Sequence, residues 1–436
     1  MSPSGGRPHV LLVAPPTSYR IAPYVAAAAR LGLDLTVVSQ GEHSLVGAVA
    51  QGLHLDLADP ERAFARLVEA MRGRRVDAVV GTDDSTVELA ARAAAAFGLP
   101  HNPPDAARLA RRKDLARARL RAAGVPVPDF RVIDLARPIV AQCGGLAYPV
   151  VVKPTMLSGS RGVIRADDES ALAAACARVR AILAREENAS AEERRQVLIE
   201  RYLPGAEVAV EGMLRGGRLE VLALFDKPDP LEGPYFEETY YVTPSRLPAG
   251  VRARIVECTA RACAAYGLRE GPVHAELRVA GGEAWILEVA ARTIGGQCAR
   301  LLRFGTGVGL EELILGHAIG RAPARAAGSG SAGVLMIPIP RAGVLRRVEG
   351  VLAAQRVPGI EEVEISVREG YELVPLPEGA SYLGFIFART EDAAQTEAAL
   401  RRAHACLRVV TAPLWKIAGG IRAETGAEAG GEIGAG

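Results

Sequence analysis

One stretch decides the fold of this chain of 436 residues: Gly271-Pro-Val-His-Ala-Glu-Leu-Arg-Val-Ala-Gly-Gly-Glu-Ala-Trp-Ile-Leu-Glu-Val-Ala-Ala-Arg292. Two alternating segments flank Gly281-Gly282, a pattern that predicts two antiparallel strands and a tight turn. Side chains alternate between the faces of a strand, so His274 and Glu276 share one face of the first strand. Glu288 is the carboxylate of the second strand.

The length of the turn determines which residues of this hairpin face each other. A two-residue Gly-Gly loop would place Glu276 and Glu288 on opposite faces. A three-residue loop, Gly281 to Glu283, would pair Ala280 with Ala284 and set the two glutamates directly opposite each other. We expect the three-residue loop.

Facing carboxylates repel, so the pair needs a cation between them or a shared proton. We interpret the pair as a cation site. Carboxylate oxygens suit Mg²⁺ or Mn²⁺, and Mg²⁺ is usually held by one or two carboxylates together with substrate phosphates. A nucleotide site is therefore predicted close to Glu276 and Glu288.

The composition is that of a globular protein with two to four domains or lobes. The 52 basic and 50 acidic residues are mixed along the chain and leave a net charge of +2, which argues against nucleic-acid and anionic-membrane partners. Six cysteines form no C-x-x-C pair, which fits a reducing cytosol and makes zinc improbable. No run of about 18 apolar residues is present, so we expect a soluble, cytoplasmic protein.

The first hundred residues alternate between strand and helix patterns. Strands are expected over 9–14, 33–39 and 76–81, and helices over 22–31, 61–72 and 86–97. This alternation predicts a small parallel sheet, whose ligands would lie beyond the carboxyl ends of its strands. The segments 15–20 and 81–86 fall there. Asp83 and Asp84 are interpreted either as caps of the following helix or, as the weaker option, as residues that grip substrate.

Two lysines and a glycine-rich loop follow. Lys113 lies near the apolar side of a basic helix expected over 106–122, and Lys153 ends a buried strand within Tyr148–Pro154, where it needs an anionic partner. Directly afterwards, Ser158-Gly-Ser-Arg-Gly-Val163 is a flexible loop whose backbone N–H groups could close over phosphates. By itself such a loop is weak evidence for a nucleotide site, because glycine-rich turns are common.

Three further segments are candidates for the site. Glu200 and Glu207 flank a turn at Pro204-Gly205, although in isolation each would more often be an ordinary surface carboxylate. The segment 226–248 is long, broken by prolines and rich in aromatic residues, and we expect it to border the substrate pocket. Thr293 to Cys298 contains a second close-approach turn.

The domain organisation is expected to have four parts. The first is an N-terminal α/β domain over 1–104. The second, over 105–325, has a flap-bearing subdomain over about 120–198 and a metal and substrate part over about 199–325. The third is an α+β domain over 326–418, with strands near 333–338, 359–367 and 382–388 and a helix over 392–405. The residues 419–436 are predicted to form a disordered tail.

Taken in order, these parts resemble an ATP-grasp ligase. The resemblance covers roughly residues 105–320, and the N-terminal part is similar to the small α/β domain that usually precedes that fold. The stretch Leu287-Glu-Val-Ala-Ala-Arg-Thr-Ile-Gly-Gly296 and the third domain look most like the L-amino-acid ligases and related carboxylate–amine ligases. The fold class implied is α/β and α+β, with an ATP-grasp core between the two flanking domains.

The resemblance also implies a role for each matching position. Lys113 and Lys153 would contact ATP phosphates under the flap that includes Ser158, Gly159, Ser160 and Gly162. The hinge from Glu200 through Tyr202 to Leu203 would contact adenine, and Glu207 would bind ribose hydroxyls. Glu276 and Glu288 would hold Mg²⁺, and Arg292 would steady the transferred phosphoryl group. Five residues are further candidates for contact with substrate: Asp83, His274, Arg292, Gly295 and Gly296.

One position departs from the family pattern. Ala290 stands where an Asn usually supplies a further metal ligand, and in the expected register it faces His274. The implied activity is ATP-dependent amide formation through an acyl phosphate. The alternatives are an ATP-grasp enzyme with another acceptor, of the carboxylase or purine-pathway type, and a non-catalytic ATP-binding module. The position of the third domain makes a homodimer plausible.

Overall fold

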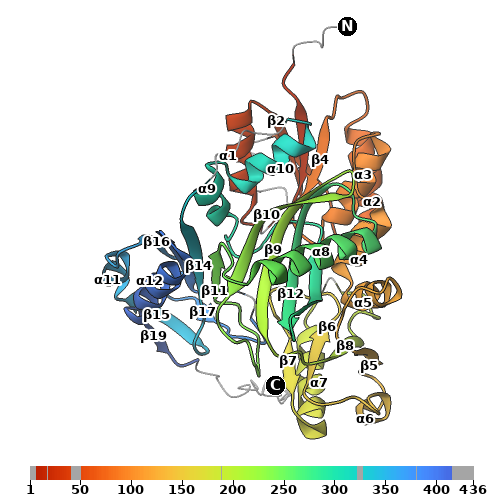
Figure 1. The fold of residues 1–436 in the computed structure, drawn as a ribbon. Helices are drawn as coiled ribbons and strands as arrows, with labels where there is room; N and C mark the ends of the chain where they lie inside the picture. Colours follow the sequence, from red (N-terminus) through yellow and green to blue (C-terminus); the bar gives the residue numbers. More distant parts are fainter. Residues whose placement is uncertain are drawn as a thin grey trace, which may run out of the picture.

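The computed structural model describes residues 6–16, 18–40, 51–187, 189–321, 328–379 and 381–414. These residues form four β-sheets, which Figure 1 shows with the first sheet at the top, the second at the bottom, the large third sheet between them and the fourth at the left. Among the described residues, none of the helices combines the length and apolar character needed to cross a membrane. The tail predicted over 419–436 lies outside the described residues.

The first sheet is parallel, as the sequence predicts, with strand order β3-β2-β1-β4. Its apolar strands are buried on both faces by helices, which explains their near-continuous hydrophobic runs. Its strands are β1 (His9–Val13), β2 (Asp34–Ser39), β3 (Gln51–His54) and β4 (Ala78–Gly81), and its helices are α1 (Ile21–Leu31), α2 (Pro60–Ala70) and α3 (Val87–Ala96). The short β3 was not predicted.

The second sheet is antiparallel and carries the glycine-rich loop between two of its strands. Its order is β5-β8-β6-β7. The strands are β5 (Phe130–Asp134), β6 (Val150–Pro154), β7 (Ile164–Ala166) and β8 (Gln196–Arg201), and the helices α6 (Ile139–Gln142) and α7 (Glu169–Leu183) accompany them. One apolar core, which includes Val150, Val152, Leu172 and Val179, joins α7 to the sheet.

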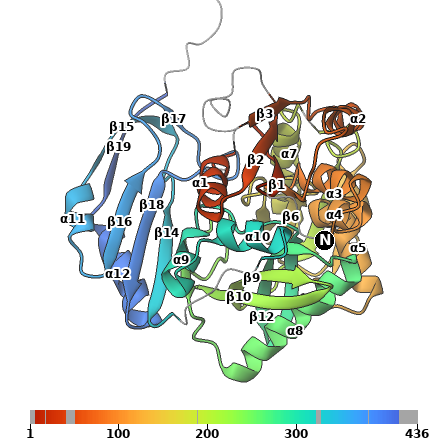
Figure 2. The same cartoon turned by 90° about the horizontal axis from the view of Figure 1, so that it is seen from above.

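The third sheet has eight strands in the order β13-β12-β9-β10-β11-β14-β18-β16. Its first five strands are β9 (Ala206–Arg215), β10 (Arg218–Lys227), β11 (Tyr240–Thr243), β12 (Gly271–Ala280) and β13 (Glu283–Ala290). Its last three are β14 (Ser331–Ile337), β16 (Ile360–Ile365) and β18 (Gly384–Thr390). The sheet therefore runs without interruption from the central strands β9–β13 into the C-terminal region (Figure 2).

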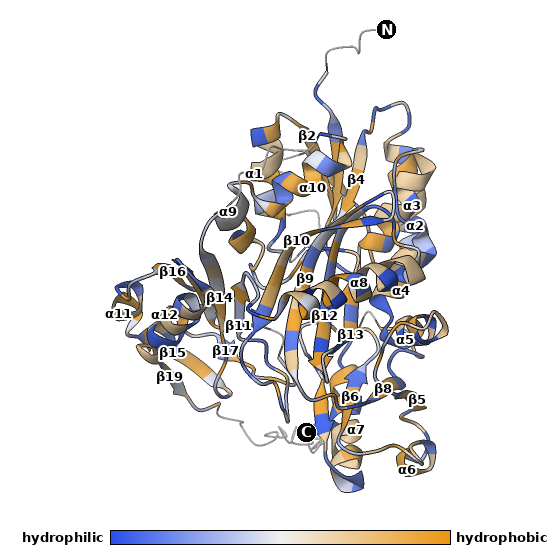
Figure 3. Ribbon diagram, viewed as in Figure 1, coloured by the Kyte–Doolittle hydropathy of each residue, from blue (hydrophilic) through white to orange (hydrophobic). Residues whose placement is uncertain are grey.

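The two faces of the central strands differ in chemistry. On one face, Val208, Val210 and Leu277 pack against α8 (Ala249–Tyr266) in a single apolar core. The alternation of side chains then places Glu207 and Glu276 on the opposite face. Figure 3 shows hydrophilic and hydrophobic residues together on the covering helices, as expected for amphipathic elements.

The hairpin at the edge of this sheet corrects the predicted turn. Ala280 pairs with Glu283 and not with Ala284, so the loop has two residues, Gly281 and Gly282. Both glycines have positive φ, 60° and 82°, which is the requirement of a type I′ turn. The three-residue loop that we expected from the sequence is therefore wrong.

The predicted pairing of the two glutamates is nevertheless confirmed. Leu277 pairs with Ile286 and Glu276 pairs with Glu288, so Leu287 is the extra residue of a β-bulge. The bulge shifts the register by one residue and returns Glu288 to the face of Glu276. The carbonyl of Leu287 accepts a hydrogen bond from the Arg117 guanidinium, which satisfies a backbone group that the bulge removes from regular pairing.

The predicted basic helix over 106–122 is broken into two helices, α4 (Pro104–Arg111) and α5 (Lys113–Ala122). Arg112 is extended, with φ −99° and ψ 100°, and the Lys113 N–H donates to Thr155 O at 2.9 Å. This backbone bond ties the start of α5 to the end of β6. The break explains why Lys113 does not lie along the apolar side of one long helix.

The C-terminal region adds a small fourth sheet, β17-β15-β19, beside the end of the large one. Its elements are β15 (Gly343–Glu349), β17 (Glu372–Leu373), β19 (Arg408–Ala412), α11 (Val351–Gln355) and α12 (Ala393–Ala405), and α12 packs on β14 and β18. The helices α9 (Arg300–Thr306) and α10 (Leu310–Ala318) follow the hairpin and bring the chain back to α1.

Candidate active site

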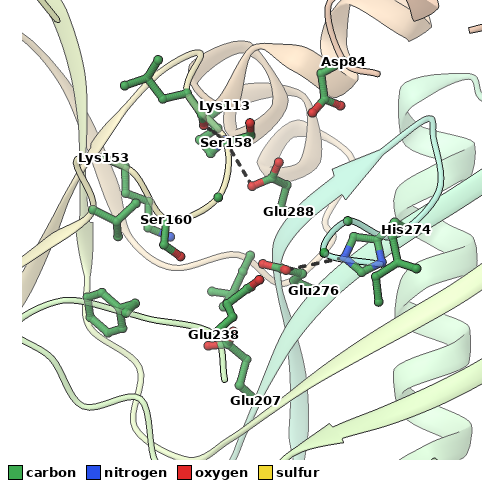
Figure 4. A pocket seen from close by; sticks show the side chains of 18 of the residues that line it. Asp84, Lys113, Lys153, Ser158, Ser160, Glu207, Glu238, His274, Glu276 and Glu288 are labelled. Carbon is green, nitrogen blue, oxygen red and sulfur yellow. Dashed lines mark hydrogen bonds and ion pairs between the residues drawn. The ribbon is translucent and has the colours of Figure 1, made fainter. Parts of the chain in front are cut away.

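A cavity of about 550 Å³ lies where the first three sheets meet. It is lined by all of the predicted site residues except Gly162. These are Asp83, Lys113, Lys153, Ser158, Gly159, Ser160, Glu200, Tyr202, Leu203, Glu207, His274, Glu276, Glu288, Arg292, Gly295 and Gly296. Residues separated by more than 200 positions in sequence therefore share one site, and Figure 4 shows several of them around it.

A buried lysine, Lys227, holds three carboxylates together on the floor of this cavity. Its Nζ lies 2.9 Å from Glu207 Oε1, 2.6 Å from Glu238 Oε1 and 3.1 Å from Glu276 Oε1. One oxygen of each carboxylate lies within 4.8 Å of the others, a spacing at which they could also share a metal ion. Such a cluster is stable only because the ammonium offsets the repulsion between the carboxylates.

The carboxylates of this cluster differ in proton affinity. Burial raises the pKa of Glu238 to about 7, and the charge of Glu276 adds to the increase. Burial would also raise the pKa of Glu276, but Lys227 and His274 outweigh it and hold that pKa well below its usual range. Glu276 is therefore ionised at neutral pH, as a metal ligand must be.

Glu288 has a separate cationic partner. Its Oε2 lies 3.2 Å from Lys113 Nζ, which also donates to Leu157 O at 2.8 Å (Figure 4). The break between α4 and α5 and the end of β6 thus direct Lys113 to the mouth of the glycine-rich loop. Glu276 and Glu288 form an all-oxygen donor set, which fits Mg²⁺ or Mn²⁺ better than softer-ligand metals.

The anionic partner predicted for Lys153 is a protein carboxylate. Lys153 Nζ lies 2.6 Å from Glu200 Oε2, and the Arg117 guanidinium bonds to the other oxygen of Glu200. Burial would raise the pKa of Glu200, but these two cations lower it to about 2. Both Arg117 and Glu200 are 1% exposed, so the ion pair is isolated from water and holds Lys153 at the cavity wall.

Glu207 is doubly engaged. Besides its contact with Lys227, its Oε2 accepts from Arg278 Nε at 2.9 Å. The Arg278 guanidinium also lies 5.5 Å from the ring centre of Tyr202, and Arg165 lies 4.5 Å from the same ring. Two guanidinium groups thus lie against Tyr202, the aromatic residue of the predicted hinge. The N–H of the next residue, Leu203, donates a hydrogen bond to no described residue.

His274 links a buried acid to the hairpin. Its Nδ1 lies 3.2 Å from Glu211 Oε2 and its Nε2 lies 3.5 Å from Glu276 Oε1. Glu211 is fully buried and also accepts from the Ile294 N–H at 3.1 Å. His274 pairs with Ala290 across the hairpin, as predicted. Ala290 therefore supplies no side-chain oxygen to this face of β13.

Arg292 is held by the N-terminal domain. Its Nε and Nη2 donate to Asp84 Oδ2 at 2.9 and 2.8 Å, and its Nη1 donates to Thr293 O at 2.8 Å. Burial would raise the pKa of Asp84, but Arg292 and Lys113 keep it below its usual range. The sequence predicts both Arg292 and Asp84 near the carboxyl ends of strands, but not their contact.

The interpretation of Asp83 and Asp84 as helix caps is wrong. The N-cap of α3 is Thr86, and neither aspartate side chain caps the helix. Asp83 instead accepts from Ser18 Oγ at 2.8 Å and from the Thr82 hydroxyl, and it lines the cavity. Asp83 and Asp84 both line the cavity, and the weaker option, that they grip substrate, stays a prediction.

Gly162 lies behind the cavity wall because the flap is tied to the C-terminal region. Its N–H donates to Pro377 O at 2.9 Å, and Arg161 Nε donates to Glu378 O at 2.9 Å. A side chain at Gly162 would meet Pro154 Cγ at 2.7 Å, and its φ of +70° also favours glycine. The flap segment is therefore anchored behind and open in front, where Ser158 and Ser160 face the cavity (Figure 4).

Several residues of the site were not predicted. Lys227 and Glu238 lie in or next to the aromatic segment 226–248, which does border the cavity as expected, through Phe236, Glu238 and Tyr241. Arg20 belongs to the predicted ligand segment 15–20. Glu211 and Arg117 carried no local signal, because a charged residue in a strand or basic helix is ordinary until its partner is known.

Comparison with known proteins agrees with this arrangement. The ATP-grasp domain family matches residues 146–300, and the ATP-grasp N-terminal domain family matches residues 25–101. L-amino acid ligase C-terminal domain 2 matches residues 335–412. The solved structure of an L-amino acid ligase from Bacillus licheniformis superposes with a TM-score of 0.81 at 26% identity, over 93% of this chain and 99% of that one.

Two relatives match over shorter regions. Carnosine synthase 1 of Gallus gallus is 30% identical over 289 residues, which are 62% of this chain and 30% of that protein. This chain therefore spans less than a third of that relative. A D-alanine–D-alanine ligase of Gloeobacter violaceus is 32% identical over 235 residues, which are 50% of this chain and 72% of the relative. With its fold, its cavity and these matches, the chain belongs to the ATP-grasp ligases.

Proposed function

We propose that the protein is an ATP-dependent carboxylate–amine ligase that joins amino acids, or a related acid and amine, and releases ADP and phosphate. One observation carries the proposal: Glu276, Glu288, Lys113, Lys153 and Arg292 line a single cavity beneath a glycine-rich loop. The match of the C-terminal region to the L-amino acid ligase domain supports the amino-acid substrate class.

The nucleotide is proposed to occupy the side of the cavity nearest the second sheet. The free N–H of Leu203 supports a backbone contact with adenine, and the open front of the Ser158 to Ser160 loop supports cover of the phosphates. Lys113 and Lys153 would contact the phosphates. Glu207 remains proposed for the ribose hydroxyls, although both of its oxygens already accept from cations.

Glu276 and Glu288 would hold Mg²⁺ or Mn²⁺. When bound, the ion would neutralise charge on the phosphates and on the transferred phosphoryl group. Lys227 contacts Oε1 of Glu276 and Lys113 contacts Oε2 of Glu288, so a metal ion would bind the other oxygen of each carboxylate or displace the ammonium. Ala290 supplies no oxygen, and we expect water to complete the coordination.

The reaction would have two steps. A carboxylate oxygen of the donor attacks the γ-phosphorus of ATP, the bond to the β,γ-bridging oxygen breaks, and ADP leaves with that electron pair. The amine nitrogen of the acceptor then attacks the acyl carbon and loses a proton as inorganic phosphate departs. Arg292, held by Asp84, would steady the phosphoryl group, so catalysis would consist mainly of positioning and charge neutralisation.

The acyl phosphate must be kept from water. The flap and the segment 226–248 both line the cavity, and Ile164, the first residue of β7 after the flap, forms a β-bridge with Tyr235 of that segment. This contact supports a closed site in which hydrolysis is suppressed. The homodimer and the cytoplasmic location expected from the sequence stay predictions.

The decisive experiment is phosphate release from Mg-ATP with a panel of amino acids, supplied singly and in pairs, and with Glu288→Gln as the control. The proposal expects release that depends on two substrates, yields a new amide and disappears in the variant. ATP turnover that needs bicarbonate, or ATP binding without turnover with any pair, would instead favour the carboxylase-type or non-catalytic alternatives.

A further inference from the structure

The N-terminal domain places a second arginine, Arg20, on the wall of the cavity. Arg20 precedes α1 and is 6% exposed. Its Nη1 donates to Ile294 O at 2.9 Å and to the Thr293 hydroxyl. Arg292 contacts the same Thr293 through its carbonyl. Both guanidinium groups therefore contact Thr293, in the turn that follows the hairpin.

The hydrogen-bonding capacity of Arg20 is largely unused. Its Nε is buried and has no hydrogen-bond partner, and no described residue accepts from Nη2. Asp83 Oδ1 is 3.7 Å from Nε, too far for a hydrogen bond, and Oδ2 of the same carboxylate accepts from Ser18 and Thr82. A guanidinium offers five N–H donors, and buried donors left unpaired are rare in proteins. The Nε and Nη2 atoms of Arg20 can therefore donate to an acceptor on a bound ligand.

The space in front of Arg20 has the right neighbours. A side chain at Gly295 would meet Tyr19 Oη at 3.8 Å and Arg20 Nη2 at 3.9 Å, the two nearest atoms within 4 Å. The absence of that side chain leaves room before both donors. The N–H groups of Gly295 and Gly296 also have no acceptor within the described part of the chain. Arg20, Tyr19, Gly295 and Gly296 all line the cavity, so a cation, a hydroxyl and two amide donors border the same pocket.

We propose that this group of residues, Arg20, Tyr19, Gly295 and Gly296, binds the free carboxylate of the amine substrate. The acceptor would then be an amino acid, not a simple amine. The inference rests on the proposed ligase function. A planar carboxylate with two oxygens matches the paired N–H donors of a guanidinium better than any neutral group does.

The position of this carboxylate site favours the acceptor over the donor. The donor carboxylate must reach the phosphoryl group near Glu276, Glu288 and Lys113. Arg292 and its partner Asp84 lie near Lys113. Arg20 lies beside Asp83 and contacts Ile294, one residue further along the turn. A carboxylate bound at Arg20 would keep its charge and direct the amine of the same molecule toward the acyl carbon at Arg292.

The test compares each acceptor amino acid with its primary amide, which keeps the amine and removes the charge. The variants are Arg20→Gln and, as a matched control, Arg30→Gln. Arg30 lies in α1, the helix that Arg20 precedes; it is 44% exposed and pairs with Glu312, away from the cavity. Amide-bond formation is measured as kcat/KM for the acceptor, with the donor and Mg-ATP held saturating.

The unaltered enzyme is expected to prefer the amino acid over its amide. Arg20→Gln should lower kcat/KM for the amino acid by about 10- to 100-fold, the worth of a charged hydrogen bond, and leave the amide within about twofold. Arg30→Gln should behave as the unaltered enzyme. Equal losses for acid and amide, or an unaltered enzyme that does not distinguish them, would overturn the carboxylate site.

A second variant guards against misfolding of Arg20→Gln. Gly295→Ala keeps Arg20 and places a methyl group in front of its Nη2, so the same selective loss is expected. If no pair of substrates is ligated at all, the proposed function fails instead. In that case the carboxylate site is tested separately, by calorimetric measurement of the binding of the amino acid and of its amide in the presence of a non-hydrolysable ATP analogue. Equal affinities for the two ligands would reject the carboxylate site. Affinities that Arg20→Gln leaves unchanged would reject it as well.

Discussion

Glu276 faces Glu288 because of a β-bulge at Leu287, not because of the length of the turn. The Gly281-Gly282 turn alone would have put the two carboxylates on opposite faces of the sheet. One inserted residue in the second strand reverses that outcome, and Arg117 binds the carbonyl that the insertion exposes. The proposed metal site therefore depends on an irregularity of the backbone and on Arg117 of α5, which supports it.

Glu200→Gln should destabilise the protein, because it leaves Arg117 buried without its countercharge. Removal of one partner of a buried ion pair typically costs about 3–5 kcal/mol. The loss is measured as the difference in free energy of unfolding in urea at pH 7. A variant as stable as the parent would show that Arg117 finds another acceptor. Asp105→Asn, at an exposed pair with Arg108, is the matched control and should have little effect.

The same pair predicts a pH dependence. The pKa of Glu200 is about 2 in the folded protein and lies near 4.3 in an unfolded chain, so its ionisation stabilises the fold above the unfolded value. The difference in stability between the parent and Glu200→Gln should be constant near neutral pH and shrink as pH falls from about 5 to 2. Unfolding curves at several pH values test this. A difference that persists to the lowest pH would contradict it.

Asp84→Asn should impair catalysis more than nucleotide binding. Arg292 would keep its contact with Thr293 O but lose the carboxylate that orients its other two nitrogens. We expect kcat to fall about 10- to 100-fold, as for loss of a charged hydrogen bond, with KM for ATP within about threefold. Steady-state kinetics against ATP measure both values. A rise in KM for ATP at unchanged kcat would place Asp84 in nucleotide binding instead.

Glu378→Ala should weaken the hold of the C-terminal region on the flap subdomain. The Glu378 carboxylate accepts from Arg178 Nε at 2.6 Å and from Arg178 Nη2 at 2.9 Å. Two further bonds lie beside it, from the Gly162 N–H to Pro377 O and from Arg161 Nε to Glu378 O. Since Arg178 and Glu378 are partly exposed, the stability should change by at most about 1 kcal/mol. KM for ATP should rise several-fold, and cleavage within 158–163 by a protease should become faster. Glu378→Gln should restore part of the parental behaviour, because it can still accept from Arg178.

Ala290→Asn should reduce the Mg²⁺ concentration needed for half-maximal activity. Ala290 pairs with His274 and is two residues from Glu288, so an Asn side chain would project on the metal-facing side of β13. The added carbonyl oxygen is a suitable ligand for Mg²⁺. A Mg²⁺ titration of ATP turnover measures the effect. No change in the titration, in a folded variant, would mean that His274 and not position 290 controls that side of the site.

The sequence predicts much of this arrangement because several signals are local. Lys153 after three valines, the glycine-rich loop and the alternation around Glu276 each depend on neighbouring residues alone. The bulge at Leu287 has no such signal, because apolar alternation continues on both sides of it. The break at Arg112 has no local signal either, since it accompanies the backbone bond from Lys113 to Thr155, 42 positions further along the sequence.

Charged residues of the site were missed for a related reason. Lys227, Glu211 and Arg117 lie in segments where a single charge is unremarkable, and their roles arise from partners on other elements. The sequence is also compatible with Asp83 as a helix cap, because its distance from the following helix is typical of a capping residue. In the structure Thr86 is the N-cap residue of α3. The Asp83 carboxylate instead accepts a hydrogen bond from Ser18 and lines the cavity.

The continuity of the eight-stranded sheet limits how this protein can be divided. β11, in the ATP-grasp part, pairs along its whole length with β14. A chain that ends before Ser331 would therefore leave the backbone N–H and C=O groups along that edge of β11 without partners. Unprotected edges of that kind recruit other strands and favour aggregation. The catalytic core is thus expected to remain in solution only when expressed together with the C-terminal strands, although the cavity is lined almost entirely by residues that precede them.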